Sequence, residues 1–270
     1  MTTTQAESPR NHTFLTFYIP WSNLSGAYVP EIYENYTQEY IDLSKKKHIE
    51  LANQFGSDYH FIDNLRYCNS LFQRHNIPML GHNDIFNIKF MLLEEYFDRY
   101  DSITYIDFDV IHKGKPAVTN VQSFLEPECA IHWTEPLPHY NIHKRVTELC
   151  RIFNVVPNRK IWQNNNGVFT ISKQAWKDLD YLYAIKEIYK TVDLDFAVTL
   201  CDETLFNFIT MYRNINVTRY DSQYNTLVRR REEFDCHIKE GDKFRMFHFT
   251  KHTGKEVLNE ELRNTNSILY

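Results

Sequence analysis

The chain has 270 residues and a formal net charge of -5 at pH 7. This length fits one large α/β domain that buries a full hydrophobic core. The acidic balance gives no general attraction to nucleic acid, and nowhere do about 18 consecutive apolar residues predict a transmembrane segment.

Glycine and cysteine usage narrows the possible sites further. No two of the seven glycines lie close together, so the phosphate-binding loops GxGxxG and GxxxxGK[ST] are missing. The five cysteines are odd in number and lack CxxC pairing, so we expect free thiols in a reducing compartment. The first residues lack a basic segment followed by an apolar one, and we therefore expect a soluble, cytoplasmic protein.

Strands and helices alternate from the start of the chain. Residues 13–19 (TFLTFYI) have the β-branched and aromatic density of a buried strand, which Pro20 ends. Residues 31–55 carry Tyr, Ile and Leu at helical spacing, and DYHFID after Gly56 predicts a second strand.

The same alternation continues to the end of the chain. Asn83 or Asp84 is expected to cap a helix with an apolar face, and SITYID (102–107) predicts a short, almost wholly apolar strand. Such a strand is typical of the middle of a parallel sheet. The later predictions are a strand at 129–133, a helix at 143–153, a strand at 167–172, helices at 173–190 and 202–212, and strands at 215–220 and 244–249. This order predicts a doubly wound, largely parallel sheet.

Two aspartates follow the apolar strand at 102–107. Asp107 and Asp109 stand two residues apart at its carboxyl end, where open α/β sheets bind their ligands. Carboxylates with this spacing can converge on one hard cation such as Mg²⁺ or Mn²⁺, which neutralises a diphosphate. The alternative is a turn-forming aspartate beside a solvated acid, but the buried strand favours the cation site.

Four segments between Asn87 and Lys255 occur in an order typical of one group of enzymes. They are a helix with a basic residue before a strand ending in DxD (87–110), NNNGVFTIS (164–172), DETLFN (202–207) and HFTKHTGK (248–255). In this order and spacing the chain resembles the GT-A-type glycosyltransferases, and among them family eight, the glycogenin and galactosyltransferase-like enzymes.

The resemblance implies a GT-A-like α/β fold with a doubly wound, mostly parallel central sheet and flanking helices. It implies one domain over residues 1–270, with a polar tail at 1–12, a nucleotide-binding half at 13–112 and an acceptor and sugar half at 113–270. The implied reaction transfers a hexosyl unit from a UDP- or GDP-sugar to a hydroxyl of a glycan or other acceptor, with retention, as in polysaccharide biosynthesis.

The resemblance also assigns a cation site. Asp107 and Asp109 would bind Mn²⁺ or Mg²⁺, and the neutral imidazole of His248 would be a third ligand. Lys89 would lean over the donor phosphates or sugar. From the residues alone, His248 is equally compatible with a core strand position and Lys89 with a solvated helix face.

Two segments would contact the nucleotide. Lys251 and Lys255 would clamp the departing diphosphate, a role that suits a compact ammonium group. The family pattern HxGxxKPW is loosely met here because Gly254 comes late, so the choice between the two lysines stays open. Tyr18 and Trp21 stand where groups that contact the base are expected.

The remaining assignments concern the donor sugar. Asn165, Asn166 and Gly167 would lie beneath it, Asp202 would bind a sugar hydroxyl, and Glu203 would lie near the β face of the anomeric carbon. The alternatives are a polar turn for the first three, a helix cap for Asp202 and an ordinary first-turn acid for Glu203. The family generally has Gln where Glu203 stands, so a carboxylate here could stabilise an oxocarbenium ion or attack it.

Two rival classes share some of these features. In haloacid-dehalogenase-like phosphatases the first Asp of a strand-end DxD is a nucleophile, but that motif opens the domain and ends in DxDx[TV], whereas Ile111 stands here. A catalytically silent sugar-binding protein could keep the shape alone. The joint presence of Asp107, Asp109 and His248 argues against loss of the cation site.

Overall fold

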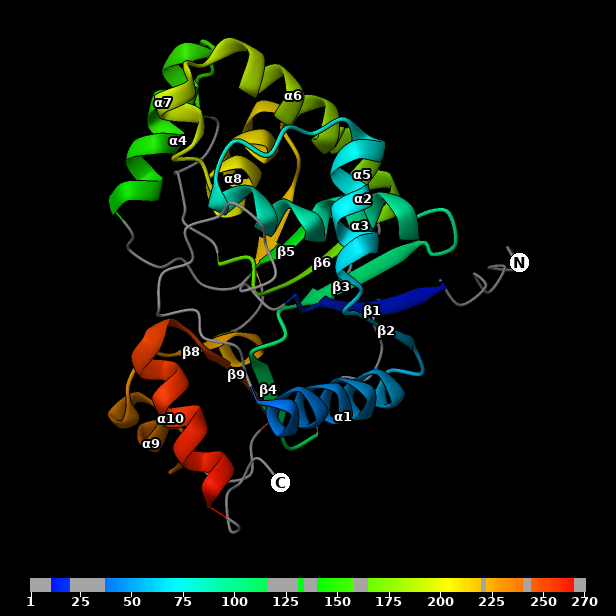
Figure 1. The fold of residues 1–270 in the computed structure, drawn as a ribbon, viewed down its shortest axis with the longest axis vertical. Coiled ribbons are helices and arrows are strands. Elements are labelled where there is room, and N and C mark those ends of the chain that lie inside the picture. The colour runs from blue at the N-terminus through cyan, green and yellow to red at the C-terminus, as the bar shows by residue number, and fades with distance from the viewer. Residues whose placement is uncertain are drawn as a thin grey trace, which may run out of the picture.

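The computed structural model describes residues 11–19, 37–115, 131–133, 140–157, 165–219, 222–239 and 244–264. These segments form a central six-stranded sheet, a smaller three-stranded sheet and the helices that cover them (Figure 1). The predicted α/β fold is confirmed.

The central sheet has the order β2-β1-β3-β6-β5-β7. Five strands run in one direction, because β1 pairs in parallel with β2 and β3, and β5 with β7. The exception is β6, which is antiparallel to both β3 and β5. The bounds are β1 His12–Phe17, β2 Asp58–Ile62, β3 Ser102–Ile106, β5 Ile131–Trp133, β6 Val168–Ser172 and β7 Val217–Arg219. The start of β6 therefore lies beside the carboxyl end of β3.

A second sheet of three strands has the order β4-β9-β8. Its strands are β4 Val110–Lys113, β8 Thr226–Val228 and β9 Arg245–Phe249. β9 is antiparallel to β4 and parallel to β8. Since β4 follows directly after the turn that ends β3, this sheet joins the late part of the chain to the centre of the main sheet.

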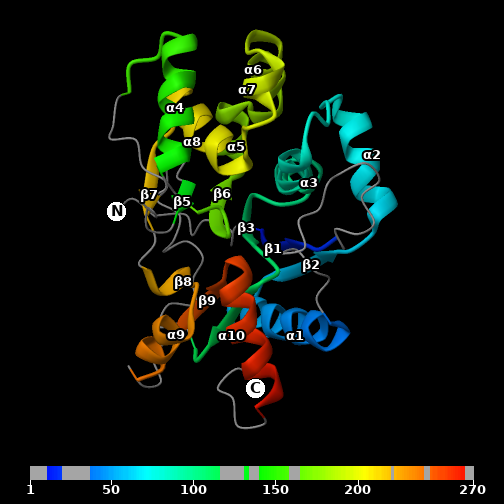
Figure 2. The ribbon, with the colours of Figure 1, turned by 60° about the vertical axis from the view of Figure 1, so that its left-hand side comes forward.

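Helices cover both faces of the central sheet. α1 lies on the same side as the second sheet, and α2, α3 and the group of α4 to α8 lie on the opposite side (Figures 1 and 2). The bounds are α1 Gln38–Gln54, α2 Leu65–His75, the 3-10 helix η3 His82–Asn87, α3 Ile88–Tyr96, α4 Tyr140–Ile152, α5 Lys173–Leu179, α6 Tyr181–Thr191, α7 Leu194–Ala197, α8 Asp202–Tyr212, the 3-10 helix η5 Ser222–Tyr224, α9 Arg231–Ile238 and α10 Lys251–Arg263.

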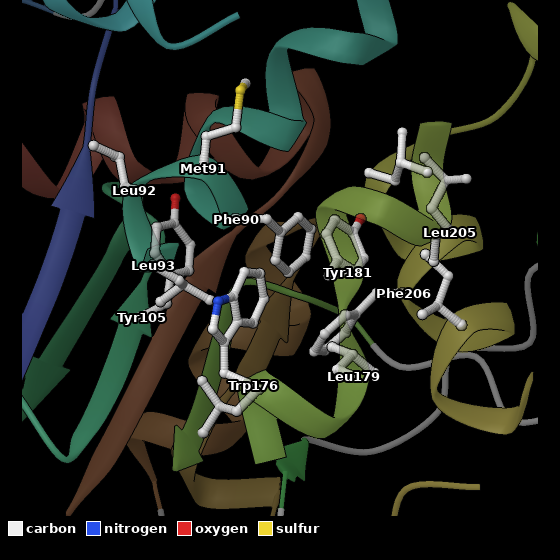
Figure 3. Packing of buried hydrophobic residues seen from close by; sticks show 14 of the residues in the cluster. Phe90, Met91, Leu92, Leu93, Tyr105, Trp176, Leu179, Tyr181, Leu205 and Phe206 are labelled. Carbon is white, nitrogen blue, oxygen red and sulfur yellow. The ribbon is translucent and has the colours of Figure 1, made fainter. Parts of the chain in front are cut away.

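Aromatic rings form the centre of the main core. The Phe90 ring on α3 lies 4.2 Å from the Tyr181 ring and 4.8 Å from the Phe206 ring, measured between centroids, and stacks on Trp176 (Figure 3). Each of these side chains is at most 4% exposed. The helices that carry them, α3, α5, α6 and α8, are thereby fixed against one another and against the sheet, because interiors pack closely and resist displacement.

Most predicted elements are present, with differences at specific residues. The predicted helix at 173–190 is two helices, because Asp180 adopts a left-handed conformation with φ 46. The helix expected at Asn83 or Asp84 begins as η3, capped by Gly81, and the Asp84 carboxylate accepts from the backbone N–H groups of Leu80 and Gly81. Local sequence patterns did not predict α2, β4, α7, η5, β8, α9 or α10.

Two further findings bear on the class of protein. In the described segments, no helix is both long and apolar enough to cross a membrane. Of the five cysteines, the structure describes four, and all four are free thiols: Cys68, Cys150, Cys201 and Cys236.

Candidate functional site

The turn that carries the two aspartates links the two sheets. It follows β3, whose five residues are all buried, and leads into β4. The backbone N–H of Asp107 donates to the carbonyl of Gly167 at 2.6 Å, and the carbonyl of Asp109 accepts from the N–H of Phe249 at 3.1 Å. Segments far apart in the sequence thus hold the turn on both sides.

Three polar side chains on one face of α1, here called the polar stripe, also bind this turn. Tyr40, Ser44 and His48 are spaced four residues apart and therefore share one helix face. The hydroxyls of Tyr40 and Ser44 donate to the carbonyl of Phe108 at 3.1 and 2.6 Å, and Nε2 of His48 donates to the carbonyl of Val110 at 2.6 Å. Three buried side chains thus donate hydrogen bonds to the carbonyl groups of Phe108 and Val110, at the turn between the two sheets.

His248 brings a third possible ligand to the aspartates. It lies on β9 opposite Val110, and its Nε2 is 3.3 Å from Oδ1 of Asp109 and 3.8 Å from Oδ2 of Asp107. One ligand atom from each residue lies within 4.8 Å of the others. The structure thus brings together the three residues predicted to form a cation site.

Burial and charge act against each other at these three residues. Burial raises the pKa of Asp107 above its ordinary value, and the nearby Lys89 opposes this only in part. Burial would also raise the pKa of Asp109, but the His248 imidazole lowers it. Burial would lower the pKa of His248, whereas the Asp109 carboxylate raises it. A positive charge between the three groups, carried by a proton or a cation, offsets the repulsion of the two carboxylates.

Lys89 is buried between two carboxylates. Its Nζ lies 3.4 Å from Oδ1 of Asp107 and 3.0 Å from Oδ2 of Asp202, and it donates to the carbonyl of Asn166 at 3.4 Å. Burial would lower the pKa of Lys89, but Asp107 and Asp202 raise it, so the ammonium group stays charged. Lys89, which is predicted to approach the donor, thus lies between Asp107 and Asp202 and binds both carboxylates.

The start of β6 reaches the site because this strand is antiparallel to β3. Oδ1 of Asn165 accepts from the backbone N–H of Gly167 at 2.9 Å, and Nδ2 of Asn166 donates to Oδ2 of Asp202 at 3.2 Å. A Cβ atom at Gly167 would overlap Cε1 and Nδ1 of His248, so only glycine allows this approach. Asn166 Oδ1 is buried without a hydrogen-bond partner among the described residues.

Two acids begin α8. Asp202 is the first helical residue, after the N-cap Cys201, and it binds Lys89 and Asn166. Glu203 accepts from Nδ2 of Asn165 at 2.9 Å. Burial, followed by repulsion from Asp202, raises the pKa of Glu203 to about 8. Neither acid is an ordinary solvated first-turn group.

A pocket of about 120 Å³ opens beside the aspartates. Tyr18 and Lys255, both predicted to contact the nucleotide, line it together with Asp107 and Asp109, and its other lining residues are Phe17, Ile19, Ile85, Phe86, Tyr105 and Phe108. The Tyr18 ring packs on the Phe108 ring with 4.4 Å between centroids. Lys255 lies on α10, and burial lowers its pKa. The Lys251 side chain and Trp21 lie outside the described part of the chain.

Sequence reasoning missed two residues at the site. The Tyr105 hydroxyl donates to Oδ1 of Asp107 at 2.8 Å. Because Tyr105 precedes Asp107 by two residues, both lie on the same face of the strand, so this contact could have been predicted from the spacing. Asn225 lies between η5 and β8 and accepts a hydrogen bond from Nδ1 of His248 at 3.0 Å. No local pattern marks Asn225, because its hydrogen bonds to Asn165 and His248 join segments that are distant in the sequence.

Known proteins resemble this chain in structure only. No protein-family profile matches the sequence, and no curated protein is significantly similar to it. Mouse xyloside xylosyltransferase 1 in its apo form is 12% identical over 91% of this chain and 99% of that chain, with a TM-score of 0.50. A glycosyltransferase involved in the glycosylation of the major capsid of PBCV-1 is 14% identical over 94% of this chain and 98% of that chain, with a TM-score of 0.49. The fold is thus that of the GT-A-type glycosyltransferases.

Proposed function

We propose that this protein is a glycosyltransferase that moves a hexosyl unit from a UDP- or GDP-sugar to a hydroxyl group of a glycan or other acceptor. The observation that carries the proposal is the convergence of Asp107, Asp109 and His248 within 4.8 Å, at the carboxyl end of β3 and beside a pocket. In this fold, that edge of the sheet is where ligands are expected.

The donor atoms at the site fit a divalent cation. Two carboxylates and one imidazole suit Mn²⁺, and Mg²⁺ is also compatible with the carboxylates. The cation would be held by Asp107, Asp109 and His248, and when bound it would act as a Lewis acid that stabilises the leaving diphosphate. Lys255, which also lines the pocket, would add a second positive charge.

The pocket offers a surface for the nucleotide. Tyr18 and Phe108 present packed aromatic rings, and Phe17 and Phe86 add apolar area around them. A planar base gains binding energy by stacking on such rings. We propose that the base lies against these residues and that the diphosphate extends towards Asp107 and Asp109.

The donor sugar would lie towards the start of α8. Asn165, Asn166 and Asp202 carry amide and carboxylate groups suited to sugar hydroxyls, and Glu203 provides a half-buried acid beside them. The segments that contribute these groups resemble those of family eight, whose members act with retention. We therefore propose a retaining transfer in which the carboxylate of Glu203 stabilises positive charge at the anomeric carbon.

The proposal is tested with a panel of nucleotide sugars and Mn²⁺, and the measured quantity is release of UDP or GDP. We expect turnover with one or a few donors, its loss in EDTA, and a fall of about 10²-fold or more in Asp109→Asn, because a cation contributes several kcal/mol to stabilising the leaving group. Asp98→Asn changes an exposed aspartate at the end of α3 and should leave turnover unchanged.

Two results would count against this function. Full activity in EDTA would exclude the role of the cation. Turnover of p-nitrophenyl phosphate with Mg²⁺, together with binding of fluoroberyllate and no binding of UDP or GDP, would instead assign Asp107 as a phosphatase nucleophile.

A further inference from the structure

A chain of hydrogen bonds runs from His248 to Glu203 through two amide side chains. Nδ1 of His248 lies 3.0 Å from Oδ1 of Asn225, Nδ2 of Asn225 donates to Oδ1 of Asn165 at 3.0 Å, and Nδ2 of Asn165 donates to Oε1 of Glu203 at 2.9 Å. His248 and Asn225 are buried, with 4% and 5% of their surface exposed. These hydrogen bonds connect His248, a proposed cation ligand, to Glu203, the acid beside the proposed sugar site.

One backbone group fixes the direction of every bond in this chain. The N–H of Gly167 can only donate, so the atom of Asn165 that faces it at 2.9 Å is the oxygen. The same oxygen faces Asn225, which must therefore present its nitrogen there and its oxygen to His248. The opposite orientation of either amide would place two acceptors or two donors face to face.

The tautomer of His248 follows from this direction. Because Oδ1 of Asn225 can only accept, Nδ1 of His248 carries a hydrogen and donates it. In the neutral ring the lone pair is then on Nε2, which faces Asp109 and Asp107 at 3.3 and 3.8 Å. Histidines that bind metals are commonly oriented by such a hydrogen bond from the other ring nitrogen.

We propose that Asn225 is a positioning residue that holds His248 in the tautomer able to bind a cation and that ties this ligand, through Asn165, to the orientation of Glu203. The inference rests on the proposed function, because it assigns His248 to a cation site. Asn225 is a residue that no local sequence pattern marks. Its proposed role makes cation binding at His248 and the orientation of Glu203 depend on one another.

The test compares two substitutions at one position. Asn225→Leu keeps the approximate volume but removes both hydrogen bonds, whereas Asn225→Asp keeps the oxygen that faces His248 and loses the donor to Asn165. The tautomer of His248 is measured by NMR on protein with ¹⁵N-labelled histidine, without metal and at alkaline pH, and the affinity for Mn²⁺ is measured by titration.

We expect wild type and Asn225→Asp to keep hydrogen on Nδ1 and to bind Mn²⁺ with similar affinity. Asn225→Leu should populate the other tautomer and bind Mn²⁺ about 10- to 100-fold more weakly. Turnover should fall in both variants, since both lose the link to Asn165. Asn87→Leu, a change at an equally buried asparagine on η3, should reduce stability but leave the Mn²⁺ affinity unchanged.

The outcomes separate this inference from the proposed function. If wild type binds Mn²⁺ and Asn225→Leu keeps both the tautomer and the affinity, the role of Asn225 is overturned and the proposed function stands. An equal loss of affinity in Asn225→Asp and Asn225→Leu would also overturn it. If wild type itself binds no divalent cation, the proposed cation dependence fails, whatever the tautomer of His248.

Discussion

Glu203 lies in an environment unlike that of an ordinary surface acid. It lies at the start of α8 among other acids, and burial raises its pKa to about 8. In water the pKa of a glutamate side chain is about 4.3, so the group is already ionised at neutral pH. A group with this pKa changes its charge in the range where enzymes work, which is typical of residues that act on substrates.

Glu203→Gln tests whether the carboxylate acts on the reacting atoms. Glutamine keeps the oxygen that accepts from Asn165 but carries no charge, so the fold and donor affinity should be nearly unchanged. We expect kcat to fall about 10²-fold, corresponding to about 2.7 kcal/mol of transition-state stabilisation. In wild type, kcat should rise with pH as Glu203 ionises, with a midpoint at or below about 8 because a bound cation would lower this pKa.

The control for this variant is its pH profile and its unfolding midpoint. The rise of kcat with pH should be absent in Glu203→Gln, since glutamine does not titrate. An unchanged kcat with a small loss of stability would instead identify Glu203 as a first-turn acid that interacts with the helix dipole.

At the scale of elements, α1 supports the aspartate turn without touching the pocket. Its polar stripe, Tyr40, Ser44 and His48, donates to the carbonyl groups of Phe108 and Val110. A turn that holds two carboxylates close together must resist their repulsion, and buried hydrogen bonds to its backbone provide that resistance. The proposed cation site therefore depends on α1, a helix far from His248 in the sequence.

Ser44→Ala tests this dependence. Removing the hydroxyl should reduce the free energy of unfolding by about 1 kcal/mol, since Tyr40 still donates to the Phe108 carbonyl. It should also weaken Mn²⁺ binding several-fold, because the turn becomes less rigid. Ser70→Ala is the matched control: this hydroxyl donates to a carbonyl within α2, far from the turn, and its loss should leave Mn²⁺ binding unchanged. Equal Mn²⁺ affinities in both variants would show that α1 does not position the site.

The limits of sequence reasoning are clearest at this scale. The apolar run of β3 correctly predicts that Asp107 and Asp109 lie at a strand end, because burial on both faces leaves a strong local pattern. The antiparallel direction of β6 leaves none, since strand direction depends on distant connections. The break at Asp180 between α5 and α6 also escaped prediction, because non-glycine residues rarely adopt a left-handed conformation.

Across the whole molecule, the resemblance grouped more of the residues that lie together in the structure than periodicity did. It grouped Lys89, the Asn165 to Gly167 segment, Asp202 and His248, all of which the structure brings together. It did not reveal Asn225, nor the helix that carries Lys255. Both depend on the second sheet, whose pairing of β4 with β9 joins the late part of the chain to the segment that follows β3.

Buried histidines should govern the stability of the whole fold in acid. His12 lies between the hydroxyls of Ser102 and Thr104, and burial lowers its pKa to about 3. In the unfolded chain His12 binds a proton as the pH falls through about 6.5, whereas in the folded protein it stays neutral down to about pH 3. The free energy of unfolding therefore decreases as the pH falls below about 6.5. The slope is about 1.4 kcal/mol per pH unit for one histidine until the folded pKa is reached.

The measurement is the urea unfolding free energy between pH 7 and 4 for wild type and His12→Gln. The variant is expected to be less stable at pH 7 but to show a shallower pH dependence, by about 1.4 kcal/mol per unit. His48, whose pKa burial lowers to about 4, should add a similar slope that persists in the variant. Identical slopes in both proteins would mean that His12 is accessible to protons in the folded state.

The pairing of β4 with β9 also determines when, during synthesis, the cluster of Asp107, Asp109 and His248 can form. A ribosome releases Asp107 and Asp109 long before His248, and domains begin to form from the N-terminal side during synthesis. Until β9 emerges, the nascent chain holds two carboxylates with neither the imidazole nor the strand that pairs with β4. The growing polypeptide would thus carry an incomplete cluster of possible cation ligands until β9 has been synthesised.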